Sequence, residues 1–139
     1  MDAVRDDGGQ ALIVVVLVLG VAAVAISGLR VAQDRIVASA RDQRAGEAAV
    51  EAATAVFADA YAAEQRAAAP SLTAVIRALA AARVREEAHA AADSMSVLNG
   101  GEAVGEPSAS CADGNVTVAL TAAERRYRAG FAAPLCSPR

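Results

Sequence analysis

An uncharged run near the N-terminus is the feature that most constrains this chain. It covers residues 8–29, GGQALIVVVLVLGVAAVAISGL, and contains no Asp, Glu, Lys or Arg. As a helix, its 22 residues rise roughly 33 Å, and the hydrocarbon core of a bilayer is about 30 Å thick. The run therefore predicts a single transmembrane helix, with the polar remainder of the chain in water on one side of the membrane.

The seven residues before the run bear on whether it is an anchor or a cleaved signal. They read MDAVRDD and are net acidic, whereas a secretory signal has a basic start and a shorter apolar run. Ala23-Val24-Ala25 offers a small-residue cleavage site, so a secreted protein that loses about 25 residues stays open as the alternative. We expect an uncleaved anchor over residues 1–29, in which Gly20, Ala22 and Ala23 allow close helix packing in the membrane.

The next stretch, residues 30–98, predicts a helical hairpin with a break at 69–71. Gly46 is the only helix breaker before Pro70, so one long amphipathic helix is expected to run from the membrane to about residue 68. Gly46 is the point where this helix could bend. Ser71 has the chemistry of an N-cap, and a second helix is expected from Ser71 to about Ser94.

Apolar side chains mark the faces by which these two helices would pack. Val50, Phe57 and Tyr61 fall on one face of the first helix. The second helix has its own apolar stripe, formed by Leu72, Val75, Ile76 and Leu79. We expect the two faces to pack against each other; a partner-binding face is the alternative for the first. His89 falls in a charged stretch, 83–89, that we expect to be exposed.

The composition changes at Asn99, and residues 99–139 predict a loop and a small β unit. The loop NGGEAVGEPSAS is rich in glycine and could include a short strand. Asp113-Gly114-Asn115 is a turn signal, and residues 116–121 alternate as a strand does. Arg125, Arg126 and Arg128 surround Tyr127; we expect the polar side of a strand or turn, with phosphate binding as the alternative. The fold class is therefore mainly α, of the α+β kind.

Two cysteines, Cys111 and Cys136, lie in this C-terminal part. An isolated pair in a small, weakly cored domain predicts one disulfide and an oxidising compartment, with two reduced thiols as the alternative. The arginines at 30, 35, 41 and 44 favour the opposite orientation, with the C-terminal part in the cytoplasm, because positive residues beside a span favour the cytoplasmic side. That rule weakens for long translocated domains, so we expect a single-pass protein with a cytoplasmic N-terminus and an extracytoplasmic C-terminal domain.

Motifs for catalysis or cofactor binding do not occur in the sequence. It has no glycine-rich phosphate loop, no GxSxG elbow and no HExxH. With His89 as the only histidine and no CxxC, no metal site is expected. The net charge of −3 gives no reason to expect nucleic acid as a partner. We expect a protein without catalytic residues, cofactor or small-molecule substrate.

The N-terminal third resembles the TadE/TadG-like proteins of tight-adherence (Flp-type) pilus systems. The resemblance rests on Gly9-Gln10-Ala11, the hydrophobic helix 12–29, the arginine-containing stretch 30–44, and the alanine-rich segment AGEAAVEAA at 45–53. It covers roughly residues 8–60, and the unit 111–120 is also similar to the segment after the helices in that group. The chain departs from peptidase-cleaved pilins at Val14, where their precursors usually have glutamate, and it has Ser27-Gly28-Leu29 where many relatives have aspartate.

This resemblance implies a structural role in the bacterial cell envelope. The chain would be a minor pilin-like or pilus-assembly component, and its partners would be the membrane and other proteins of the pilus or secretion apparatus. A generic signal-anchored or secreted envelope binding module, unrelated to pili, is the alternative.

Overall fold

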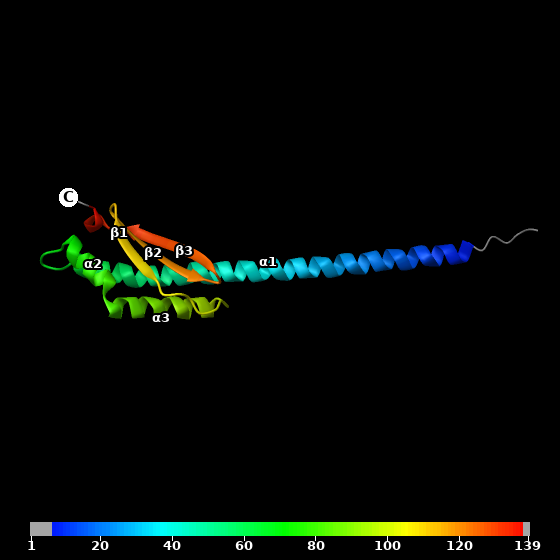
Figure 1. Ribbon diagram of the computed structural model, residues 1–139, viewed down its shortest axis with the longest axis horizontal. Coiled ribbons are helices and arrows are strands. Elements are labelled where there is room, and N and C mark those ends of the chain that lie inside the picture. Colours follow the sequence, from blue (N-terminus) through cyan, green and yellow to red (C-terminus); the bar gives the residue numbers. More distant parts are fainter. Residues whose placement is uncertain (1–6, 138–139) are drawn as a thin grey trace, which may run out of the picture. The chain divides into compact units, whose positions relative to one another are not determined.

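The structure of the chain is a computed structural model that describes residues 7–137. Within this range, three helices come first: α1 (Asp7–Gln65), α2 (Leu72–Ala80) and α3 (Ala82–Leu98) (Figure 1). Three strands come next: β1 (Ser108–Ala112), β2 (Asn115–Ala122) and β3 (Arg125–Ala132). A short 3-10 turn, η1 (Pro134–Cys136), comes last. The expected class, mainly helical with a small C-terminal β element, is confirmed.

The chain divides into two compact units, Met1–Ser39 and Ala40–Arg139. In the first unit, the described residues all belong to the N-terminal part of α1. The second unit contains the rest of α1 together with α2, α3, the three strands and η1. All side-chain packing between elements described below lies within this second unit.

The three strands form an antiparallel sheet in the order β1-β2-β3. β2 is central, and its side chains alternate between a buried face with Val116, Val118 and Leu120 and an exposed face with Thr117 and Thr121. This alternation is what predicted a strand at 116–121, and the strand is confirmed. Exposure also alternates along both flanking strands, and in β3 the less exposed residues are Tyr127, Ala129 and Phe131.

Both hairpins turn through two residues with positive φ, the geometry that matches the twist of paired strands. The first turn uses Asp113 (φ 50°) and Gly114 (φ 75°), as the sequence predicts. The second uses Ala123 (φ 46°) and Glu124 (φ 61°), two residues that are sterically strained in this region. This second turn had no signal in the sequence.

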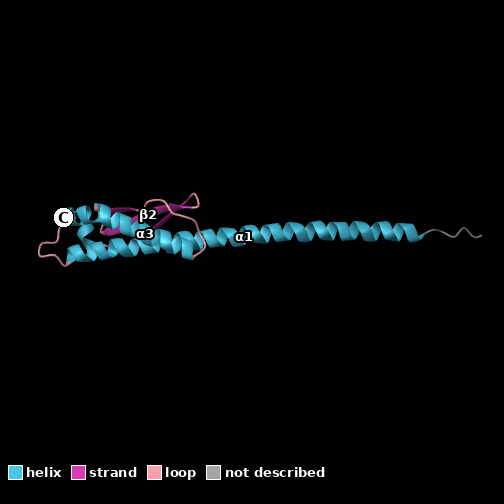
Figure 2. Cartoon of the chain, turned by 90° about the horizontal axis from the view of Figure 1, so that it is seen from below, coloured by secondary structure: helices cyan, strands magenta, loops and turns pink. Residues whose placement is uncertain are grey.

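Within the second unit, α1 is covered by two different layers. The sheet lies against one side of α1, and α3 runs alongside it on another (Figures 1 and 2). Small residues permit the close approach of the helices, since Ala49 and Ala53 of α1 and Ala88 and Ala92 of α3 are all fully buried. The core also contains larger side chains from every layer: Val50, Phe57, Tyr61, Val75, Leu79, Val84, Val104, Val116, Val118 and Leu120.

The single helix expected over 71–94 is wrong. Two helices, α2 and α3, meet at Ala81, whose extended backbone (φ −62°, ψ 131°) ends one and starts the other. The run Ala80-Ala81-Ala82 contains no breaker, so only tertiary packing could reveal the break. Ser71 does cap α2, because its Oγ accepts a hydrogen bond from the Ala74 N–H at 3.2 Å.

The expected long helix is confirmed: α1 is one helix through Gly46, and it ends at Gln65, three residues before the expected end. One expectation about α3 is wrong. His89 is half-buried rather than exposed, and its Nδ1 is buried without a hydrogen-bond partner among the described residues. It lies on α3 next to the fully buried Ala88, so it sits at the margin of the core.

Candidate membrane anchor and interaction surfaces

The N-terminal part of α1 is long and apolar enough to cross a membrane. Its large side chains, from Leu12 to Leu29, are all exposed, and no part of the apolar window is covered by protein. An isolated helix with leucine, isoleucine and valine on every side is unstable in water but stable in hydrocarbon, where its backbone hydrogen bonds are satisfied internally. The polar Ser27 satisfies its hydroxyl within the helix, donating to the Ala23 carbonyl oxygen at 2.8 Å.

The residues expected to pack in the membrane, Gly20, Ala22 and Ala23, lie within this exposed helix. A Cβ added at Gly20 would have no atom within 4 Å, and the same holds at Gly28. Within the chain itself, therefore, nothing requires glycine at either position. Close approach by a helix of another protein is the role that small residues at these sites leave open.

The face formed by Val50, Phe57 and Tyr61 lies inside the second unit. Their side chains are 3%, 0% and 4% exposed. The Tyr61 ring meets Phe131 of β3 edge to face, with centroids 5.6 Å apart. In the folded unit these three residues pack against the chain's own elements and are covered from any partner.

The second helix meets this core through only half of its apolar stripe. Val75 and Leu79 are buried, whereas Ile76 is 50% exposed and Leu72 is 36% exposed. The expected packing of all four residues is therefore wrong for Leu72 and Ile76. These two residues lie one turn apart on the same side of α2 and leave apolar surface open to solvent.

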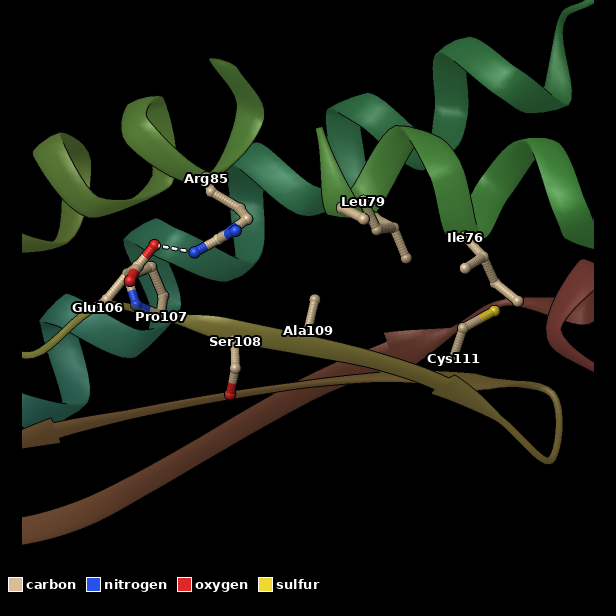
Figure 3. Close-up of a pocket in the computed structure, with 9 residues that line it drawn as sticks. Ile76, Leu79, Arg85, Glu106, Pro107, Ser108, Ala109 and Cys111 are labelled. Atoms are coloured by element: carbon tan, nitrogen blue, oxygen red, sulfur yellow. Dashed lines mark hydrogen bonds and ion pairs between the residues drawn. The ribbon is translucent and has the colours of Figure 1, made fainter. Parts of the chain in front are cut away.

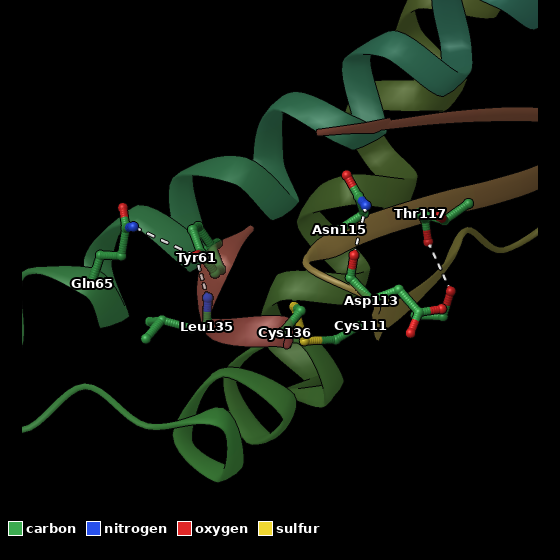
Figure 4. Close-up of a disulfide and its surroundings, with 9 residues drawn as sticks. Tyr61, Gln65, Cys111, Asp113, Asn115, Thr117, Leu135 and Cys136 are labelled. Atoms are coloured by element: carbon green, nitrogen blue, oxygen red, sulfur yellow. Dashed lines mark hydrogen bonds between the residues drawn. A yellow bond between two sulfur atoms is a disulfide. The ribbon is translucent and has the colours of Figure 1, made fainter. Parts of the chain in front are cut away.

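Cys111 of β1 and Cys136 of η1 are joined by a disulfide (Figure 4). Their Cα atoms lie 5.2 Å apart, a separation typical of disulfides. The C-terminal turn is held a second time by Tyr61, whose hydroxyl accepts a hydrogen bond from the Leu135 N–H at 3.2 Å. The disulfide thus ties the last described turn to the sheet, and Tyr61 ties it to α1.

A groove runs between α2 and the edge strand β1 (Figure 3). It encloses about 320 Å³, and its apolar wall includes Ile76, Leu79 and Ala109. Ala109 points toward α2, while its neighbour Ser108 points away. At one end the groove is bounded by an ion pair between Arg85 of α3 and Glu106 of the loop before β1. Sequence reasoning missed this groove, because its two walls lie about 30 residues apart along the chain.

The described residues offer no metal centre. Within them, no three His, Cys, Asp or Glu side chains lie close enough together to hold a metal ion. Comparison of the chain with family models, with curated proteins and with solved structures finds no match. The apolar span, the disulfide and the exposed surfaces of the second unit are therefore the features that bear on function.

Proposed function

We propose that this chain is a non-enzymatic, membrane-anchored structural component of a tight-adherence (Flp-type) pilus or a related secretion apparatus. The observation that carries the proposal is that one continuous helix, α1, contains an uncovered apolar stretch, Leu12 to Leu29, and continues into a small α+β unit. We propose this kind of assembly because residues 8–60 resemble TadE/TadG-like proteins. Its partners would be the membrane and other proteins of that apparatus.

The second unit would lie outside the cytoplasm. Its disulfide supports this orientation, since such bonds persist in oxidising compartments and are rare in the reducing cytosol. The arginines after the run favour the opposite orientation under the positive-inside rule. The disulfide outweighs them here because it lies in the folded unit that would have to be translocated as a whole.

One observation favours the alternative of an envelope binding module. The groove beside β1 combines an apolar wall with an edge strand, an arrangement that can accept an extended peptide. In that case the chain would be an anchored or secreted receptor, unrelated to pili. The mass of the mature N-terminus separates the secreted form from the anchored one.

Deletion of the chain in cells that make it tests the assembly role. Loss of surface filaments or of secretion, restored by the wild-type chain, is the expected result. The control is a variant that folds but does not insert, Val16→Arg, which should fail to restore either. Filaments and secretion that persist unchanged after deletion would rule out the assembly role and leave the binding module.

A further inference from the structure

The outer face of the sheet is free of acidic residues and is exposed except at Ala119. On this face β2 presents Thr117, Ala119 and Thr121, which pair in register with Gly130, Arg128 and Arg126 of β3. Ser108 and Ser110 of β1 continue the same face. Its charges are Arg126 and Arg128, both exposed, and neither has an ion-pair partner among the described residues. In a chain of net charge −3, this surface is distinctly basic.

A second exposed surface has the opposite charge. The side of α1 left uncovered by the sheet and by α3 is a stripe at every fourth residue, including Glu47, Glu51, Ala55 and Asp59. All four are exposed. Glu47 accepts a hydrogen bond from Gln43 at 2.9 Å, within the same stripe. The stripe, which we call the acidic stripe, carries three carboxylates; the exposed Arg44 lies beside its N-terminal end, three residues before Glu47.

The two surfaces match in spacing. Arg126 and Arg128 lie two residues apart on one strand, about 6.6 Å. Glu47 and Glu51 lie four residues apart on one helix, about 6 Å. Small exposed residues flank both pairs, namely Thr121 and Gly130 on the sheet and Ala55 on the helix, so few side chains would hold a docked helix away from the sheet.

The two arginines and the acidic stripe also lie at neighbouring levels along α1. Tyr127 lies between the two arginines in sequence, and its hydroxyl contacts the Asp42 carbonyl oxygen at 3.3 Å while its ring covers Gly46. Both arginines therefore lie, on the other face of the sheet, at the level of the turns of α1 that immediately precede Glu47. Two copies whose second units lie parallel would bring these surfaces together with a shift of about one helical turn along α1, roughly 5 Å.

From these matches we infer that a second copy of this chain docks its acidic stripe on the basic sheet face of the first. The inference rests on the proposed assembly role and names one partner within it. The contact is heterologous, since each copy offers a different surface, and repetition of such a contact extends into a ring or a helical array. An anionic lipid or polysaccharide would also meet two arginines, but neither would account for the matched carboxylates on α1.

Charge reversal in the full-length chain, solubilised in detergent, tests the docking. Arg126→Glu with Arg128→Glu should lower the yield of associated copies about tenfold, because like charges would then face each other. Glu47→Arg with Glu51→Arg should do the same. A mixture of the two variants, or one chain with all four changes, should restore association. The matched control, Arg77→Glu with Arg83→Glu, changes the net charge equally on exposed residues of α2 and α3 and should have no effect.

The contact is located by replacing Thr117 with p-benzoylphenylalanine in a mixture of ¹⁴N- and ¹⁵N-labelled chains. Cross-links between copies should join Thr117 to the tryptic peptide 45–66, which contains all three carboxylates of the acidic stripe. Cross-links to another region, to lipid only or to no second copy overturn the inference. Charge-reversal mixtures that fail to restore association overturn it equally. The assembly role is judged separately, by filament formation after deletion, so either can fail without the other.

Discussion

The ring of Tyr127 lies across the backbone of Gly46, and this contact fixes how β3 meets α1. A Cβ at position 46 would lie 2.7 Å from Tyr127 Cε1 and closer still to Cζ. The Tyr127 hydroxyl donates a hydrogen bond to the Asp42 carbonyl oxygen at 3.3 Å, which holds the ring in place. Glycine at 46 therefore serves packing within the unit.

Gly46→Ala should destabilise the second unit by about 1 kcal/mol. Alanine gains up to about 1 kcal/mol in helix propensity, but overpacking a filled site costs about 1–3 kcal/mol. In a Tyr127→Ala background the clash is gone, and the same substitution should become stabilising. Urea unfolding of a chain lacking residues 1–29 measures both. If Gly46→Ala changes the free energy of unfolding equally in the wild type and in the Tyr127→Ala variant, the Tyr127 ring is not the cause of the destabilisation.

Phe57→Ala should lower the free energy of unfolding by about 3–5 kcal/mol, since the ring is 0% exposed at the centre of the core. Glu51→Ala on the same helix is the control, because its side chain is exposed and should cost under about 0.5 kcal/mol. Thermal or urea unfolding of the shortened chain compares them. Equal melting temperatures for the Phe57 variant and the wild type would mean that the helix is not packed as described.

The second hairpin turn offers a stabilising change. Ala123 and Glu124 both have positive φ, so replacing them with Asn and Gly should relieve strain and raise stability by about 1 kcal/mol. For a unit of this size that is a rise in melting temperature of about 4–8 °C. Gly114→Ala at the first turn, where φ is 75°, should act in the opposite direction. No gain from Asn-Gly would contradict the turn geometry.

Local patterns predicted the parts of this fold whose causes are local. The apolar run, the Ser71 cap, the Asp113-Gly114 turn and the alternating strand at 116–121 each arise from residues within one segment. The break at Ala81 and the turn at Ala123-Glu124 lack any such signal, because packing and strand register impose them.

The surfaces were harder to predict than the elements. The exposure of Ile76 depends on where α2 ends and on how β1 lies beside α2. The groove depends on the same two features, because α2 and β1 form its walls. The Arg126–Arg128 face was visible in sequence as a basic cluster around Tyr127. Which side of the strand each residue occupies emerged only from the register with β2.

Val16→Arg should abolish stable anchoring in the membrane. Position 16 lies in the apolar span, where an arginine costs about 2.5–3.5 kcal/mol on insertion scales. Membrane fractionation, with extraction at high pH, compares the variant with the control Val16→Leu. Retention of the arginine variant at the level of the control would show that the span does not cross the bilayer.

The proposed function depends above all on a chain anchored by α1 with its disulfide-bonded unit outside the cytoplasm. Trapping of thiols in intact cells tests this arrangement: cells are quenched in acid, the protein is denatured, and free cysteines are labelled with a maleimide polymer that shifts its mass. We expect no shift without reductant, and a shift of two labels after reduction, for Cys111 and Cys136. Two labels per chain without reductant would contradict the extracytoplasmic placement.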